Sequence, residues 1–172
     1  ACLQRPLGRD VRLYHRDGDH QERLRLKVYQ HEGSLPLSHA VPALENFGFT
    51  VLEEIPTTLE GSDKGMQGGT IHDFTLATPA GASAAELLDR SDVIGDSITA
   101  VLNQIAENDI FNRLVVAARI SAEESGWLRA FYRYLRQANT AFTIDTVVEA
   151  LAVAPDVTRA LIELFRLRHD PE

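Results

Sequence analysis

The spacing of apolar residues changes along this chain, and that change limits the folds open to it more than any other feature. In short stretches between residues 11 and 78, apolar and polar residues alternate, which is the period of a strand with one buried face. From residue 83 onward apolar residues recur every three or four positions, which is the period of an amphipathic helix. A chain whose two halves carry different periods is typical of the α+β class.

The first part of the chain predicts a hairpin of two strands. Val11 and Leu13 alternate with polar neighbours, and residues 23–28 alternate so that one face is apolar and the other basic. Residues 17–19, Asp-Gly-Asp, supply turn chemistry between the two stretches. We therefore expect the two strands to pair in the antiparallel sense.

A helix and two more strands are predicted next. Apolar residues at helical spacing cover residues 37–47, with Ser38 as the expected N-cap and Gly48 in the left-handed closing position. Extended structure resumes at Phe49, where Leu52 breaks the alternation and predicts a twist or bulge. A further strand is expected over residues 70–78.

The second half predicts a series of helices that pair as antiparallel hairpins. A long helix is expected over residues 83–105, with Gly95 as its weak point. Another begins near residue 109, and Ser121 with Glu124 forms a capping box for the next. Two final helices are expected near residues 144–152 and 155–167.

Several segments resemble one family, the large bacterial NAD-specific glutamate dehydrogenases. The segments, in chain order, are LRLKVY (24–29), PLSHAVPALENFGFTVLEE (36–54), IHDF (71–74), ENDIFNRLV (107–115), LRAFYRYLRQ (128–137) and ALIELFRLRHDP (160–171). In that family such blocks lie between the regulatory half and the catalytic half of a very long enzyme. The resemblance implies an internal piece of a dehydrogenase without its catalytic domain.

The resemblance also implies a domain plan. We expect an ACT-like, ferredoxin-like antiparallel sheet with two helices over residues 1–82, completed by helix 83–105, and a helical motif over residues 106–172. An ACT fold normally closes with a strand beside the first core strand, but here helix follows from Ser83. We therefore predict that residues 11–15 fill that slot, since a preceding hairpin strand satisfies the same backbone groups.

Composition argues against several classes of protein. The net charge is −8, and the basic residues are scattered, which disfavours binding to nucleic acid. The single cysteine, Cys2, excludes an internal disulfide framework and a cysteine-based zinc site. Apolar runs fall short of the roughly 18 to 20 residues that span a bilayer, so we expect a cytoplasmic protein with no membrane partner.

The sequence predicts no catalytic, cofactor-binding or metal-ligating residues in this segment. His72 and Asp73 are neighbours in a predicted strand, so their side chains should point to opposite faces and serve structure. The six histidines lack helical metal spacing, and the glycines of residues 61–69 lack phosphate-loop spacing. The resemblance assigns NAD to the catalytic domain of the parent enzyme.

One polar cluster in the family-like block allows two interpretations. Asp109 and Arg113 are four residues apart and predict an ion pair, with Asn108 and Asn112 on the adjacent ridge. The cluster either docks against another domain of the parent enzyme, which we favour because it lies in the family-like block, or only caps a helix. Three arginines of the following helix are expected to be exposed: Arg129, Arg133 and Arg136.

The loop after the second strand is a candidate ligand site. ACT modules that sense amino acids generally bind them near this loop, and Gly33, Ser34 and Leu35 match its position. No specific ligand signature is present, and Leu35 followed by Pro36 also fits simple packing.

The resulting hypothesis is a non-catalytic regulatory and scaffolding segment of an NAD-specific glutamate dehydrogenase. The parent reaction implied by the resemblance converts L-glutamate, NAD and water to 2-oxoglutarate, ammonia and NADH. The expected partners are other domains and subunits of the parent, in a homo-oligomer, with an amino acid as a possible effector. The alternative is an amino-acid-sensing, ACT-type allosteric module.

Overall fold

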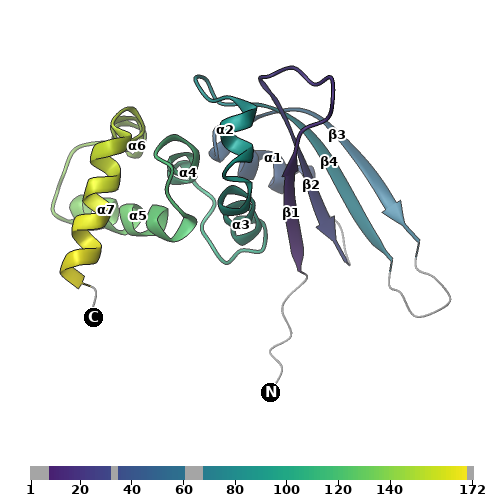
Figure 1. Ribbon diagram of the computed structural model, residues 1–172. Coiled ribbons are helices and arrows are strands. Elements are labelled where there is room, and N and C mark those ends of the chain that lie inside the picture. Colours follow the sequence, from purple (N-terminus) through teal and green to yellow (C-terminus); the bar gives the residue numbers. More distant parts are fainter. Residues whose placement is uncertain (1–7, 32–34, 61–67, 170–172) are drawn as a thin grey trace.

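The computed structural model describes residues 8–31, 35–60 and 68–169, and it has an α+β fold (Figure 1). The strands are β1 (Arg9–Tyr14), β2 (Arg23–Gln30), β3 (Thr50–Leu59) and β4 (Gly69–Ala77). The first three helices are α1 (Leu37–Asn46), α2 (Ala84–Leu88) and α3 (Ser91–Leu102). The remaining helical elements are the 3-10 turn η1 (Ile110–Asn112), α4 (Arg113–Ala117), α5 (Ala122–Gln137), α6 (Ile144–Val153) and α7 (Pro155–His169).

The four strands form one antiparallel sheet in the order β1-β2-β4-β3. β1 pairs with β2 along its whole length, with Val11 opposite Val28 and Leu13 opposite Leu26. The predicted pairing is therefore confirmed. β1 takes the outer position beside the first core strand, so a strand from upstream supplies the ladder hydrogen bonds that β2 needs.

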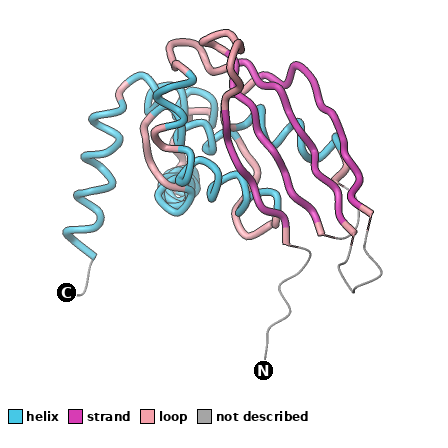
Figure 2. Tube along the Cα trace, turned by 45° about the vertical axis from the view of Figure 1, so that its right-hand side comes forward, coloured by secondary structure: helices cyan, strands magenta, loops and turns pink. Residues whose placement is uncertain are grey.

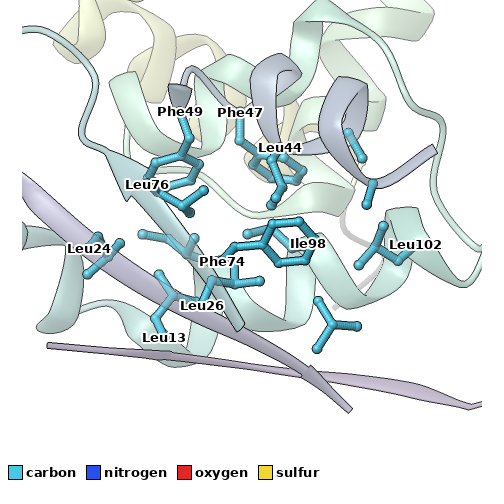
Figure 3. Close-up of a cluster of buried hydrophobic side chains, with 14 of the residues drawn as sticks. Leu13, Leu24, Leu26, Leu44, Phe47, Phe49, Phe74, Leu76, Ile98 and Leu102 are labelled. Atoms are coloured by element: carbon cyan, nitrogen blue, oxygen red, sulfur yellow. The ribbon is translucent and has the colours of Figure 1, made fainter. Parts of the chain in front are cut away.

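One face of the sheet is covered by helices, as Figure 2 shows with the strands on one side and the helices on the other. The alternation in β2 and β4 directs apolar side chains to that face, where α1 and α3 pack against them (Figure 3). The largest fully buried side chains of this first core are Leu24, Leu26, Val28, Leu44, Phe47, Phe74, Leu76, Ile94, Ile98 and Val115.

The helix expected over residues 83–105 is two helices, so that prediction is wrong in detail. The break lies at Arg90, whose backbone leaves the helical region between α2 and α3. Gly95 lies inside α3, and the helix is not broken there. A Cβ on Gly95 would lie 3.3 Å from the carbonyl oxygen of Val11, so the glycine allows α3 to approach β1 closely.

The side chain of Asn103 explains why α3 ends before Ile105. Its amide accepts a hydrogen bond from the backbone N–H of Arg9 at 3.0 Å and donates one to the Arg9 carbonyl at 2.9 Å. The next residue, Gln104, has a left-handed backbone with φ 59°. The helix therefore stops at Asn103, its C-cap, whose side chain binds the start of β1.

The boundaries of α1 also differ from expectation. Pro36, not Ser38, occupies the N-cap position, and no side chain caps this helix. Pro42 lies inside the helix. Gly48 does adopt the predicted left-handed conformation, with φ 93°, and the predicted irregularity at Leu52 is a register shift in β3.

The helices after residue 109 build a second core. The expected helix start is a 3-10 turn, η1, followed by the short helix α4, whereas the predicted capping box of Ser121 and Glu124 is present at α5. The buried side chains of the second core are Phe111, Leu114, Ala118, Ile120, Leu128, Val148 and Ile162.

The helix α4 joins the two cores. Val115 and Val116 are buried in the first core, while Leu114 and Ala118 are buried in the second. In Figure 1, α4 accordingly lies between the sheet with its covering helices and the group α5 to α7. The two halves of the chain therefore share one helix that is buried on both sides.

An ion pair on the outer face of the sheet predicts part of the acid sensitivity of the fold. Arg25 donates to both carboxylate oxygens of Asp19, at 2.7 and 2.9 Å, and these hydrogen bonds lower the pKa of Asp19 from its ordinary value of 3.8 to about 2. A lowered folded-state pKa contributes stability above pH 3.8 that is lost as the pH falls toward 2. We expect Asp19→Asn to melt at a lower temperature than the unsubstituted chain near neutral pH. The difference in melting temperature should shrink as the pH falls from 3.8 toward 2.

Thermal melting followed by circular dichroism at a series of pH values measures this difference. Asp17→Asn is the matched control, because Asp17 is an exposed residue of the same turn. A gap between Asp19→Asn and the parent that stays constant down to pH 2 would contradict the assignment.

Candidate docking groove and arginine-lined cleft

Two residues of the polar cluster predicted for docking, Asp109 and Asn112, bind a side chain of this chain instead, that of Arg129. Arg129 donates from Nε to Asp109 at 2.6 Å and from Nη2 to Asp109 and Asn112 at 2.8 and 3.0 Å. Its guanidinium also lies over the Phe111 ring, 5.7 Å from the centroid. We name Asp109, Asn112 and Arg129 the clamp, because they bind η1 to α5.

Two expectations about these residues are wrong. Asp109 pairs with Arg129 rather than with Arg113, and Arg129 is only 5% exposed. The reason is local. Asp109 is the N-cap of the 3-10 turn, with its carboxylate accepting from the N–H of Phe111 at 3.0 Å, so it is not on the same α-helical ridge as Arg113.

The other members of the predicted docking set have separate environments. Asn108 accepts a hydrogen bond from the side chain of Asn46 at 2.8 Å, which links α1 to the start of the helical motif. Asn112 is buried and donates to the carbonyl of Glu107 at 3.0 Å. Arg113 is exposed, and within the described chain its side chain has no ion pair or hydrogen bond.

His72 and Asp73 point to opposite faces of the sheet, as predicted. The His72 ring lies against Phe74 on the covered face, and its Nδ1 is 2.8 Å from the carboxylate of Glu54. Asp73 accepts hydrogen bonds from the hydroxyl of Tyr14 at 2.7 and 2.6 Å. His72 and Asp73 therefore do not contact each other through their side chains, and each makes a separate structural contact.

The candidate ligand loop is described only in part. Gly33 and Ser34 lie outside the described residues, and Leu35 is buried in the first core. For Leu35 the structure supports the packing interpretation.

An apolar groove of about 430 Å³ lies between α5, α6 and α7. Several of its side chains are exposed, among them Tyr134, Leu135, Leu161 and Leu164. We call it the docking groove, lined by Leu128, Phe131, Tyr132, Tyr134, Leu135, Val147, Leu151, Leu161, Leu164, Phe165, Arg168 and His169. Its basic lining residues are Arg168 and His169, both in the last turn of α7.

A second hollow, of about 310 Å³, lies between the sheet half and the helical motif. We call it the arginine cleft, because Arg90, Arg113 and Arg119 line it together with one carboxylate, Glu86. The remaining lining residues are Phe47, Pro79, Ala80, Gly81, Ala82, Leu87, Val116, Ala117 and Ala152.

Sequence reasoning missed both hollows, although a signal for the groove was present. The last helix carries apolar residues at Leu161 and Leu164 in addition to the buried Ile162, so it is more apolar than one buried face requires. No comparable signal marks the cleft, because Arg90 and Arg119 are far apart in sequence and meet only through the packing of α4.

Two family models match successive parts of this chain. The family model described as "Glutamate dehydrogenase, ACT3 domain" matches residues 9–90, and "Glutamate dehydrogenase, helical motif 3" matches residues 106–171. An NAD-specific glutamate dehydrogenase from Pseudomonas aeruginosa is 33% identical over 168 residues, which is 96% of this chain. This chain belongs to the NAD-specific glutamate dehydrogenase family.

Two further relatives carry the same description. The Halomonas elongata protein is 33% identical over 146 residues, or 85% of this chain, and the Mycobacterium tuberculosis protein is 28% identical over 159 residues, or 90%. The chain spans only 10%, 9% and 10% of the lengths of the Pseudomonas, Halomonas and Mycobacterium proteins, respectively. The region between the two family matches contains α3, which packs on β1.

Two kinds of feature are absent from the described residues. Within residues 8–31, 35–60 and 68–169, no three His, Cys, Asp or Glu side chains group so as to hold a metal ion. In the same part of the chain, no helix combines the length and the apolar character that crossing a membrane requires.

Proposed function

We propose that this segment is a non-catalytic regulatory and scaffolding part of an NAD-specific glutamate dehydrogenase, and that its docking groove binds a helix supplied by another subunit of the same enzyme. The parent would oxidise L-glutamate with NAD in its catalytic domain. The observation that carries the proposal is the docking groove, because it gathers several exposed apolar side chains of α5 and α7 on one concave surface.

The chemistry of the groove favours coverage by protein. Leu164 is 61% exposed and Tyr134 is 71% exposed, and both line a single concave surface. Soluble proteins rarely leave contiguous apolar surface open unless it binds something, because each exposed Å² costs about 25 cal/mol. Burial of this surface would therefore stabilise an assembly.

The occupant that fits best is an amphipathic helix from the remainder of the dehydrogenase. A groove between helices accepts the apolar face of another helix. The relatives are about ten times longer than this chain, so most of such a polypeptide lies outside it. Arg168 and His169 at one end of the groove would favour an acidic residue at the corresponding end of the incoming helix.

The non-catalytic assignment is supported by what the candidate catalytic groups do. His72 contacts Glu54, and Asp73 accepts from Tyr14. Each carboxylate or imidazole that invited a catalytic interpretation is engaged in a contact that stabilises the fold.

A single charge placed in the groove tests the docking proposal. In the full-length dehydrogenase, Leu164→Asp is expected to weaken assembly at least about tenfold, because a carboxylate would have to be buried against apolar side chains. The oligomeric state measured by light scattering over a range of protein concentrations, together with glutamate-dependent NADH formation, checks this.

Leu167→Asp is the matched control, because Leu167 is 75% exposed on the same helix and does not line the groove. In the segment alone, both variants should melt at the temperature of the unsubstituted segment, since both leucines are exposed. Assembly that is equally unaffected by both substitutions would exclude the groove as a docking site, and NADH formation by the segment alone would exclude the non-catalytic assignment.

A further inference from the structure

The arginine cleft lies where the two halves of the chain meet. One wall comes from the loop after β4 and from α2, including Pro79 and Leu87, and the other comes from α4, including Arg113 and Val116. Arg90, between α2 and α3, and Arg119, after α4, complete it. Any molecule bound in this cleft would touch both halves at once.

The charges of the cleft are unbalanced in favour of cations. Arg90 is half-buried, and its side chain donates only to the carbonyl of Val115, at 3.2 Å, among the contacts of the described chain. A guanidinium has five N–H donors, so most of this group's capacity remains unused. Arg113, as described above, has neither an ion pair nor a side-chain hydrogen bond in the described residues.

The one carboxylate in the cleft does not offset these cations. Glu86 accepts hydrogen bonds from the backbone N–H and the hydroxyl of Ser83, at 3.2 and 3.1 Å, in the capping box of α2. Its other oxygen is 3.7 Å from Arg119, so that ion pair is loose and exposed. Glu86 is therefore committed to the helix start, and two guanidiniums of the cleft lack a carboxylate partner.

Arg90 is also partly withdrawn from water and lies near further cations. Burial lowers the pKa of Arg90 from its ordinary value, and the nearby cations Arg119 and Arg159 lower it further, while Glu124 raises it. This gathering of cations is notable in a chain of net charge −8, where carboxylates outnumber basic side chains. Charged groups that lose water are normally paired, so a bound anion would relieve the repulsion.

We propose that the arginine cleft is a binding site for a small dianion, held between the guanidiniums of Arg90 and Arg113. Two cations without carboxylate partners match two negative charges, and guanidinium binds both carboxylate and phosphate oxygens in bidentate geometry. A volume of about 310 Å³ is at the lower end of the range for ligand sites, which suits a small dicarboxylate or a phosphate. The partly exposed apolar residues Pro79 and Ala117 would contact a short carbon chain.

Binding in the cleft has a structural consequence. Because the walls belong to both halves, the ligand stabilises the joint that α4 makes between them, and this raises the melting temperature as ligand concentration rises. The site is separate from the docking groove, and it can be tested in the segment without any activity of the parent enzyme.

Isothermal titration calorimetry at constant ionic strength tests the proposal, with succinate and inorganic phosphate as dianions and acetate as a single-carboxylate control. The expected result is saturable binding of at least one dianion in the millimolar range or tighter, and binding of acetate at least about tenfold weaker. The tighter of the two dianions identifies the acidic group as carboxylate or phosphate.

Two variants locate the site. Arg113→Gln is expected to weaken dianion binding at least about tenfold, and because Arg113 is exposed the variant should fold like the parent by circular dichroism. Arg136→Gln is the control, because Arg136 is an exposed arginine that donates to the Thr140 carbonyl outside the cleft. Absence of saturable dianion binding, equal binding of acetate, or unchanged binding by Arg113→Gln would each overturn the assignment.

Discussion

Replacing Arg129 with alanine is expected to lower the free energy of unfolding by about 2 to 4 kcal/mol. The substitution removes the guanidinium that bonds both Asp109 oxygens and Asn112, and it leaves the largely covered Asp109 carboxylate without its counter-ion. It also removes the cation from the face of the Phe111 ring. Urea unfolding followed by circular dichroism gives the difference.

Arg133→Ala is the matched control on the same helix. Arg133 and its partner Glu107 are both more than half exposed, and exposed ion pairs contribute about 0 to 1 kcal/mol. Arg129→Lys should fall between the two, because an ammonium keeps the charge but cannot reproduce the fork. Equal effects of Arg129→Ala and Arg133→Ala would show that the clamp does not stabilise η1 against α5.

Phe74→Ala is expected to destabilise the chain by about 3 to 5 kcal/mol, because it empties a fully buried site in the first core. The effect should reach the second core, since α4 is buried in both. Trp127, the only tryptophan, reports on that half through its contact with Phe165, at 5.2 Å between ring centroids. Its fluorescence transition should therefore shift to lower temperature together with the circular dichroism transition.

The control for this experiment is Leu52→Ala on β3, where the side chain is half exposed and the change should stay within about 0.5 kcal/mol. In Phe74→Ala, the Trp127 fluorescence transition could stay at the temperature of the unsubstituted chain while the sheet melts at a lower one. That result would mean that the two halves unfold independently. The shared helix α4 would then join the two halves without making them unfold together.

The local pattern of the chain was enough to predict most of its elements. Alternation over residues 11–13 and 23–28 predicted the β1-β2 hairpin, because in a sheet with one covered face the pattern sets both the strand and its register. The capping box at Ser121 and the left-handed Gly48 were predicted because each depends on residues within a few positions of itself.

The partners of polar groups were not predictable in the same way. Asp109 was assigned to Arg113 because a regular helix would place them on one ridge, but a 3-10 turn at residues 110–112 turns Asp109 toward Arg129, twenty positions along the chain. Nothing local to Arg129 indicates that it is buried. Its burial follows from how η1 packs on α5.

What the sequence by itself determined is the strands, most of the helices, their apolar faces and the family, since these depend on near neighbours and on matching residues. Only the tertiary structure decided that α4 belongs to both cores, that the clamp is internal, and that arginines distant in sequence line one cleft. The physical reason is that ion pairs, grooves and clefts depend on the distance between elements. That distance is set by how buried side chains of the whole chain pack together.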